Sequence, residues 1–188
     1  MLITKDFVLL NFPKTGTTFA RKVIKRAYRA RRTRWRAFLE SVGLREPDVL
    51  ELILPKLKAD GVCSSVAKDQ HGKLRQIPKK YEDRNIVSIV RDPVDRYLSM
   101  YHFRRWARYN EGELRSVFPN FPDISFDEYF LWLQSKGAKY SCANNGDPIK
   151  VGYQSIRFIR FYFKDPDLVF DNLGNNTDEC LEELNAIT

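Results

Sequence analysis

The sequence predicts an α/β fold, a three-layer sandwich whose central sheet is mostly parallel. Short apolar runs without turn residues, at 7–10 and 85–90, are typical of buried strands. Each run is followed by a segment with the periodicity of an amphipathic helix. Because parallel strands are joined by crossover helices, which cover the faces of the sheet, this alternation favours helical layers on both sides.

The composition fits one packed domain over residues 1–188. Hydrophobic residues make up 43% of the sequence and aromatic residues 13%, which argues for a full core and against disorder. No apolar run approaches the length that spans a membrane, and the N-terminus shows no secretion signal, so a cytoplasmic location is expected. The cysteines, Cys63, Cys142 and Cys180, are odd in number and widely spaced, which fits neither a disulfide framework nor a metal site.

The remaining elements follow in order. The first helix is expected from Thr17 to about Arg32, with one apolar stripe. Its apolar positions are Phe19, Ala20, Val23, Ile24, Ala27 and Tyr28. The other expected elements are helices at 35–42 and 48–57, a strand at 62–67, a helix from 92, a loop at 109–124, a helix from 125, a loop at 142–152, a helix at 154–163, a strand at 167–170 and a helix at 177–186.

Two helix starts carry specific capping signals. Asp92 suits the N-cap of the helix after the strand at 85–90, and Pro93 suits its first helical position. Ser125 and Glu128 form a capping-box pattern at the start of a later helix.

The segment 11–18 predicts an anion cradle, a P-loop-like phosphate-binding strand–turn–helix. A strand, a turn that contains Gly16 and a helix that begins with two threonines bring free backbone N–H groups and the positive end of the helix dipole together. Lys14 adds a mobile charge. Nucleotide triphosphatases place the lysine directly after the last glycine, whereas Lys14 lies two residues before Gly16. The pattern therefore favours phosphate binding without a magnesium triphosphate, and the alternative is an ordinary turn with a capping threonine.

Positive charge is concentrated in the same part of the chain. The net charge is +8, and residues 7–39 contain ten Lys or Arg and no acidic residue. Such a field suggests an anionic ligand, with nucleic acid as one candidate. For the arginines at 29–36 we favour a solvated helix face, or a surface for acidic acceptors, over DNA binding.

Three polar clusters follow predicted strands: 13–18, 69–71 and Arg91. Ligands of parallel sheets bind beyond the carboxyl ends of the strands. Ser99 lies two turns into the helix that starts at Asp92. We expect these groups to face one crevice.

Two of these segments resemble the sulfotransferases that use 3′-phosphoadenosine 5′-phosphosulfate (PAPS). Residues 12–18, Phe-Pro-Lys-Thr-Gly-Thr-Thr, resemble the family's 5′-phosphosulfate loop. Residues 88–102, Ser-Ile-Val-Arg-Asp-Pro-Val-Asp-Arg-Tyr-Leu-Ser-Met-Tyr-His, resemble its 3′-phosphate segment. The pattern is most similar to the carbohydrate-type branch, and it covers about residues 5–105 with a weaker echo at 154–163.

The resemblance implies a role for each matching residue. The N–H groups of Thr15, Gly16, Thr17 and Thr18, with the hydroxyls of the last two, would hold the 5′-phosphate. Lys14 would contact the bridging and sulfonate oxygens and stabilise the leaving phosphate, while Arg91 and Ser99 would bind the 3′-phosphate. Sulfuryl transfer is mostly positioning and charge stabilisation, so no metal is required.

The acceptor hydroxyl needs a general base, for which His71 is the best candidate. It follows a predicted strand in a polar loop, and members of the branch often place a catalytic His or Glu in this stretch. Asp69 is the reserve base, and the alternative is that His71 is an ordinary surface residue. For His102 we favour packing over bracing a phosphate. For Arg96 we favour an ion pair on the helix face over a phosphate contact.

The predicted function is sulfuryl transfer from PAPS to a hydroxyl of a carbohydrate or small-molecule acceptor, with 3′,5′-adenosine bisphosphate as product. The alternatives are a catalytically inactive binder of anions or nucleotides and a small-molecule kinase of the P-loop class. The sequence is short for the family and has no Arg-Lys-Gly near its C-terminus, which leaves adenine contacts and part of the acceptor pocket unaccounted for. Acceptor loops are expected at 34–47, 73–84 and 107–150, but neither the acceptor nor the oligomeric state can be read from them.

Overall fold

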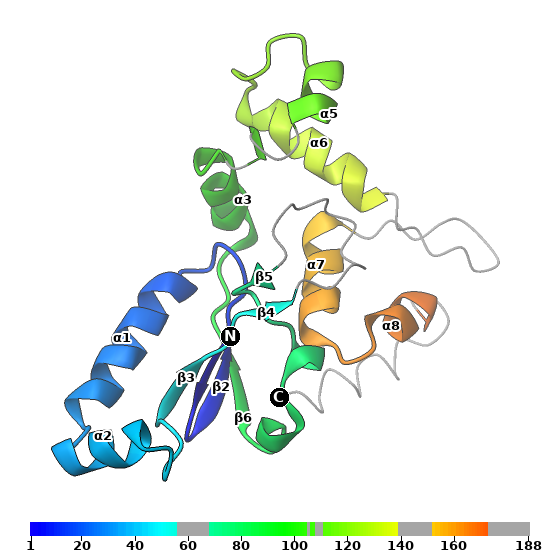
Figure 1. Cartoon of the computed structure of the whole chain (residues 1–188). Coiled ribbons are helices and arrows are strands. Elements are labelled where there is room, and N and C mark those ends of the chain that lie inside the picture. Colours follow the sequence, from blue (N-terminus) through cyan, green and yellow to red (C-terminus); the bar gives the residue numbers. More distant parts are fainter. Residues whose placement is uncertain (56–67, 105, 108–110, 139–151, 173–188) are drawn as a thin grey trace. The chain divides into compact units, whose positions relative to one another are not determined.

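The computed structural model describes residues 1–55, 68–104, 106–107, 111–138 and 152–172 (Figure 1). The chain divides into two compact units. The first comprises Met1–Lys56 and Val66–Arg91, and the second comprises Leu57–Ser65 and Asp92–Thr188.

A four-stranded sheet with the order β3-β1-β2-β6 forms the centre of the first unit. Its strands are β1 (Leu2–Thr4), β2 (Phe7–Leu10), β3 (Val49–Glu51) and β6 (Asn85–Ser88). A second, two-stranded sheet pairs β4 (Leu54–Pro55) with β5 (Lys68–Asp69), and the turns η2 (Leu74–Gln76) and η3 (Lys79–Tyr81) lead on to β6. The side chains of Leu2, Ile3, Val8, Leu9 and Leu10 are buried.

The sheet is mixed, which corrects the expectation of a mostly parallel one. β2 and β6 are parallel, with Leu10 opposite Ser88, but β1 runs antiparallel to both β2 and β3. The parallel pair belongs to the strands that the sequence identified. The antiparallel pairs come from two strands of three residues each that the sequence analysis did not identify.

The helix expected at 48–57 is wrong, because the structure forms β3 and β4 there. Val49, Leu50 and Glu51 extend the sheet by pairing with β1. A short apolar run does not distinguish a strand from a buried helix, so contacts with a distant strand decide the outcome.

Helices α1 (Thr17–Ala30) and α2 (Arg34–Ser41) confirm the two helices expected after the first strand. Figure 1 shows both on one side of the sheet. The Tyr28 hydroxyl donates a hydrogen bond to the Asp6 carboxylate at 2.6 Å, which ties α1 to the turn between β1 and β2. Of the apolar stripe, Phe19 and Val23 are exposed while Ile24 is half-buried, so the stripe covers the sheet only in part.

Among the described residues of the first unit, α1 and α2 are the two α-helices and supply one helical layer. The three-layer arrangement therefore stays an expectation.

The second unit is helical in its described part. Its helices are α3 (Pro93–His102), α5 (Glu111–Val117), α6 (Phe126–Ala138), α7 (Tyr153–Tyr162) and α8 (Pro166–Asn172). An aromatic core joins α3, α5 and α6, formed by Tyr97, Trp106, Leu114, Ile124, Tyr129, Trp132 and Leu133. None of the described helices combines the length and the apolar composition that crossing a membrane requires.

Both capping predictions are confirmed. The Asp92 carboxylate accepts hydrogen bonds from the backbone N–H groups of Val94 and Asp95, with Pro93 at the start of α3. The backbone N–H of Ser125 donates to Glu128 Oε2 at 2.7 Å, and the N–H of Glu128 donates to Ser125 Oγ at 3.2 Å.

Two other expectations in this unit are wrong. The loop expected at 109–124 contains α5, in which Glu111 and Arg115 form an ion pair one turn apart. The strand expected at 167–170 is part of α8, because the Asp165 side chain accepts from the Leu168 N–H and caps a helix that starts at Pro166. The strand expected at 62–67, the helix at 177–186 and nearly all of the loop at 142–152 lie outside the described residues.

A methyl group at Gly72 would test the packing between β4 and the segment after β5. A Cβ added there would lie 2.5 Å from Met1 Cε and 2.8 Å from Leu54 Cδ1. We expect Gly72→Ala to lower the free energy of unfolding by about 1–3 kcal/mol, measured by urea denaturation. Gly112→Ala is the control, because a Cβ in α5 meets no atom within 4 Å and a helical alanine is favourable. An unchanged midpoint for Gly72→Ala would show that its neighbours move aside without cost.

Candidate functional site

The loop between β2 and α1 has the backbone shape of an anion cradle. Lys14 adopts a φ of 67° and Gly16 a φ of 85°, both left-handed, whereas Thr15 between them does not have a positive φ. Alternation of this kind turns successive N–H groups toward one side, as in anion-binding nests. The Thr15 hydroxyl donates a hydrogen bond to the Phe12 carbonyl at 2.8 Å, which holds the loop closed from within.

The start of α1 leaves its donors available. The N-cap is Gly16, and no side chain caps the helix, so the structure does not contain the capping threonine considered as the alternative. The N–H groups of Phe19 and Ala20 both donate to the Gly16 carbonyl. By contrast, the N–H groups from Thr15 to Thr18 donate no hydrogen bond to any residue that the structure describes. Four such donors at the positive end of a helix suit a phosphate or sulfate group.

The threonine side chains of the loop differ in what they can do. Thr15 and Thr17 are buried, and the Thr17 hydroxyl lies 3.4 Å from the Phe12 carbonyl, a long hydrogen bond. Thr18 is exposed at the first turn of α1. The first two therefore brace the loop, and the Thr18 hydroxyl is the one presented to solvent.

His71 is fixed to the strand that leads into the cradle. Its Nδ1 lies 2.7 Å from the carbonyl oxygen of Asn11, which follows β2 directly. A carbonyl can only accept a hydrogen bond, so Nδ1 carries the proton in the neutral ring and the lone pair is on Nε2. The Asn11 amide donates to the Gln70 carbonyl at 3.1 Å, so this buried asparagine holds two consecutive residues of the segment after β5.

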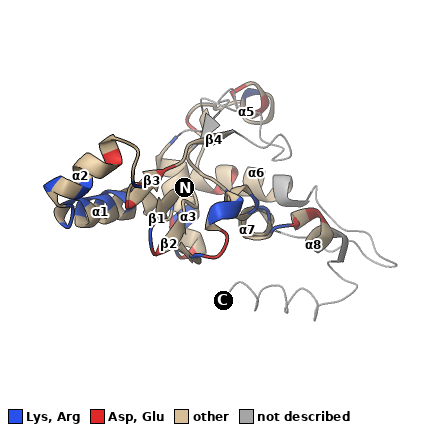
Figure 2. Cartoon of the chain, turned by 60° about the horizontal axis from the view of Figure 1, so that its bottom comes forward, with Lys and Arg blue, Asp and Glu red and all other residues tan. Residues whose placement is uncertain are grey.

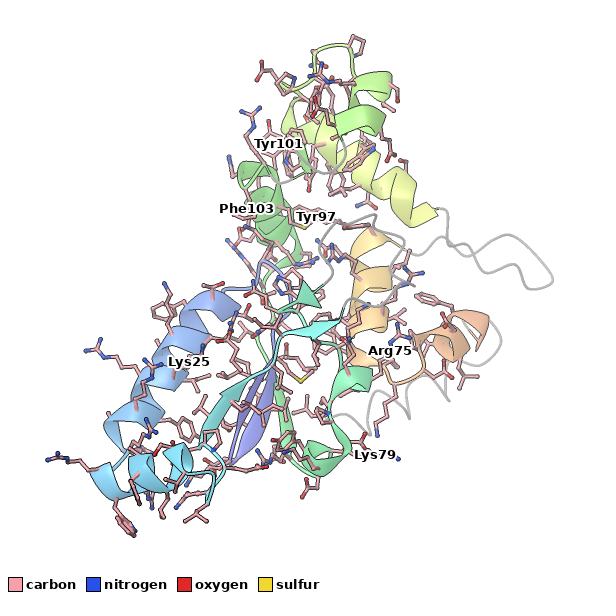
Figure 3. The ribbon with its side chains drawn as sticks, in the orientation of Figure 1. Lys25, Arg75, Lys79, Tyr97, Tyr101 and Phe103 are labelled. Atoms are coloured by element: carbon pink, nitrogen blue, oxygen red, sulfur yellow. The ribbon has the colours of Figure 1, made fainter. Side chains whose placement is uncertain are left out.

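Arg21, one turn into α1, continues this connection. Its guanidinium donates to Gln70 Oε1 at 2.8 Å and forms an ion pair with Glu51 of β3. Burial lowers the pKa of Arg21. Lys25 pairs with the other oxygen of Glu51, and Figure 3 shows it on the side of α1 that faces β3. These two cations are thus partly neutralised. The sequence analysis did not assign Arg21 to the site, and it included Asn11 and Gln70 only as members of the segments 11–18 and 69–71, without a role of their own.

The strand ends bring Arg91 to the same edge of the sheet. Because β2 and β6 are parallel and Leu10 lies opposite Ser88, their carboxyl ends leave the sheet side by side. The Ser88 hydroxyl donates to the Leu10 carbonyl at 3.4 Å, at the end of this pairing. Arg91 follows three residues later and is exposed. The first unit therefore gathers the cradle, His71 and Arg91 at one edge.

Comparison of the sequence with known protein families indicates what kind of reaction this edge of the sheet serves. Residues 4–141, more than two thirds of the chain, match the family model described as a sulfotransferase domain. The chain belongs to the sulfotransferase family. The matched span contains the cradle, His71, Arg91 and Ser99. No curated protein and no solved structure matched the chain.

Within this sulfotransferase, the remaining predicted residues have different surroundings. Asp69 is the last residue of β5. Ser99 belongs to α3 in the second unit, where it is half-buried. Arg96 of α3 is buried, and the ion pair expected for it stays a prediction. Desolvation, followed by the nearby charge of Arg157, lowers the Arg96 pKa to about 10.

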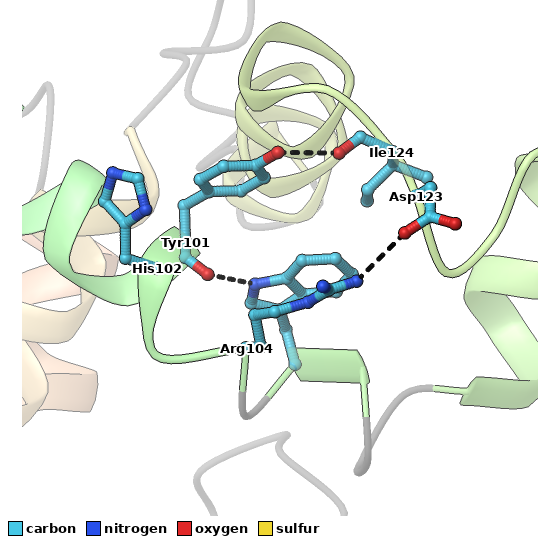
Figure 4. A pocket seen from close by; sticks show the side chains of 6 residues that line it. Tyr101, His102, Arg104, Asp123 and Ile124 are labelled. Atoms are coloured by element: carbon cyan, nitrogen blue, oxygen red, sulfur yellow. Dashed lines mark hydrogen bonds and ion pairs between the residues drawn. The ribbon is translucent and has the colours of Figure 1, made fainter.

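The second unit of the sulfotransferase also holds a pocket of about 330 Å³ (Figure 4). Its walls are Tyr101, His102, Arg104, Trp106, Asp123 and Ile124. The Tyr101 hydroxyl donates to the Ile124 carbonyl at 2.7 Å, and Trp106 Nε1 donates to the Tyr101 carbonyl at 2.9 Å. Arg104 pairs with Asp123 and donates to the Pro122 carbonyl. These bonds connect the walls to one another and join the end of α3 to the segment before α6.

Proposed function

We propose that this chain transfers the sulfuryl group of PAPS to a hydroxyl of a carbohydrate or small-molecule acceptor. The observation that supports this proposal best is the set of unengaged N–H groups from Thr15 to Thr18, in a chain of the sulfotransferase family. His71 is held beside the loop through Asn11, with Nε2 as its basic nitrogen. The proposal includes no metal.

In this proposal each residue has its own role in an in-line displacement at sulfur. The four N–H groups hold the 5′-phosphate, and Lys14 lies against the bridging oxygen between phosphorus and sulfur. Arg91 and Ser99 bind the 3′-phosphate, which distinguishes this donor from an ordinary adenylate. Fixed donors that meet the charge as it develops are the main source of catalysis in reactions of this kind.

The bonds change as follows. The acceptor oxygen forms a bond to sulfur while the bond from sulfur to the 5′-phosphate oxygen breaks. The acceptor proton passes to His71 Nε2, and the electron pair of the broken bond remains on the phosphate of 3′,5′-adenosine bisphosphate. Lys14 stabilises the charge that accumulates on this oxygen.

The nucleotide that stabilises the protein most will test the donor assignment. We expect 3′,5′-adenosine bisphosphate to raise the melting temperature more than adenosine 5′-monophosphate or ATP with magnesium, because only the bisphosphate engages both phosphate sites. A ligand at 100 times its Kd adds about 2.7 kcal/mol of stability. Differential scanning fluorimetry with the three nucleotides at equal concentration measures the order.

A larger shift with ATP and magnesium would overturn the proposal and favour the kinase alternative. A bisphosphate shift without release of bisphosphate in the presence of PAPS and a broad set of acceptors would favour the inactive binder.

A further inference from the structure

The outer face of α2 exposes apolar side chains where a helix normally presents polar ones. Trp35 is 66% exposed, Phe38 52% and Val42 49%, and Leu44 follows at 76%. The first three recur at the spacing of one helix face. The rings of Trp35 and Phe38 stack with centroids 5.6 Å apart. Exposed apolar side chains gathered in one short segment indicate an interaction surface. Val42 is the C-cap of α2 and Leu44 follows it, and we call these four residues the α2 apolar face.

Exposed arginines occur in the same part of the chain, on α1 and at the start of α2. Arg26, Arg29, Arg31 and Arg34 are exposed and form no ion pair with any residue that the structure describes. Other arginines nearby are engaged, as in the ion pair between Arg32 and Glu40 at 2.7 Å. Figure 2 shows basic residues along both α1 and α2. The segment 26–44 therefore combines exposed apolar side chains with four exposed guanidinium groups that pair with none of the described residues.

We infer that the α2 apolar face and its arginines dock onto the surface of an anionic phospholipid bilayer. Helices that lie in a membrane interface combine Trp, Phe and Leu on one face with Lys or Arg beside it. The apolar side chains would enter the boundary between headgroups and acyl chains, and the guanidinium groups would meet the phosphates. The inference does not depend on the transfer reaction.

A polyanionic glycan is the competing partner, since arginines bind sulfates and aromatic rings stack on sugars. Val42 and Leu44 decide between the two. Exposed aliphatic side chains gain little from a hydroxyl-covered polymer, whereas in a bilayer interface they gain free energy in proportion to the apolar area that leaves water. The patch as a whole thus fits a lipid surface better.

The fluorescence of Trp35 can report directly on vesicle binding. The chain contains three tryptophans, and Trp106 and Trp132 are each only 6% exposed. A blue shift of the emission upon addition of vesicles therefore reports transfer of Trp35 out of water. We expect this shift, together with cosedimentation, with vesicles of phosphatidylcholine and phosphatidylserine at 3:1, and we expect it to decrease as salt is added.

Substitutions separate the contributions of the apolar side chains and of the arginines to vesicle binding. Trp35→Phe should remove the shift while cosedimentation continues. Phe38→Ser combined with Leu44→Ser should weaken vesicle binding at least tenfold, as should Arg31→Glu combined with Arg34→Glu. The matched control is Leu131→Ser, which removes a 67% exposed leucine from α6 and should leave binding unchanged. Melting curves of each variant confirm that it is folded.

Three results would overturn the inference. They are no binding to anionic vesicles, equal binding to vesicles of phosphatidylcholine alone, and an equal loss in Leu131→Ser. Tight binding to a soluble sulfated polysaccharide without vesicle binding would assign the face to a glycan instead.

Discussion

Lys14→Ala is expected to lower kcat for sulfate transfer about 100- to 1,000-fold, the loss typical of removing one donor from a developing oxyanion. The reason is that Lys14 supplies the only mobile charge within the cradle sequence 11–18. In the proposed mechanism, its ammonium group stabilises the leaving phosphate as the bond to sulfur breaks. The measurement is the initial rate of bisphosphate release at saturating PAPS.

Lys22→Ala is the matched control for this change. Lys22 is exposed on α1, and its replacement removes one positive charge a few residues from the cradle, so the kcat of this variant should be unchanged. Alanine keeps the β-carbon, so the left-handed backbone at position 14 carries the same strain in both proteins. A kcat for Lys14→Ala within threefold of the original would remove the lysine from the mechanism.

His71→Asn is expected to lower kcat about 100- to 10,000-fold, the range for loss of a general base. The asparagine amide can still donate to the Asn11 carbonyl, so the segment after β5 keeps its tether while Nε2 is lost. Binding of the bisphosphate, measured by its melting shift, should be retained.

The sequence supplies a control for this variant as well, because it contains two histidines. His102 is exposed in the second unit with its ring edge against Tyr101, so His102→Asn should keep full turnover. Full turnover in His71→Asn would place the base elsewhere, with Asp69 as the next candidate.

The parts of the site that could be predicted depend on local signals. Residues 7–18 combine an apolar run, a glycine turn and a helical stripe, and each of these acts over a few neighbouring residues. The cap at Asp92 is equally local. These signals located the cradle, the strand at 85–88 and the helix after it.

Contacts between distant segments were not predictable in this way. β1 and β3 have three residues each, too few for a periodic pattern, and they form because they pair with each other. The link from Asn11 to Gln70 and His71 crosses about sixty residues, and no spacing in the sequence marks it. A polar residue at the end of a buried strand was the one available signal for Asn11.

The wrong prediction of a strand at 167–170 could have been avoided. The run at 167–170 is apolar and short, which suggested a strand, but Asp165 and Pro166 repeat the cap-and-proline pattern seen at the start of α3. If this capping pattern is counted as strongly as the apolar run, the sequence predicts the helix α8 that the structure contains.

The hydrogen bond from Thr15 to Phe12 has a consequence for the reaction cycle. A loop that the chain itself holds in shape need not be ordered when the nucleotide arrives, which favours tight binding. In the proposed reaction, PAPS and its spent form carry the same 5′-phosphate, so both benefit from this equally. The product is then an effective competitor of fresh donor, and we expect sustained sulfation to require a separate hydrolytic activity that removes the bisphosphate.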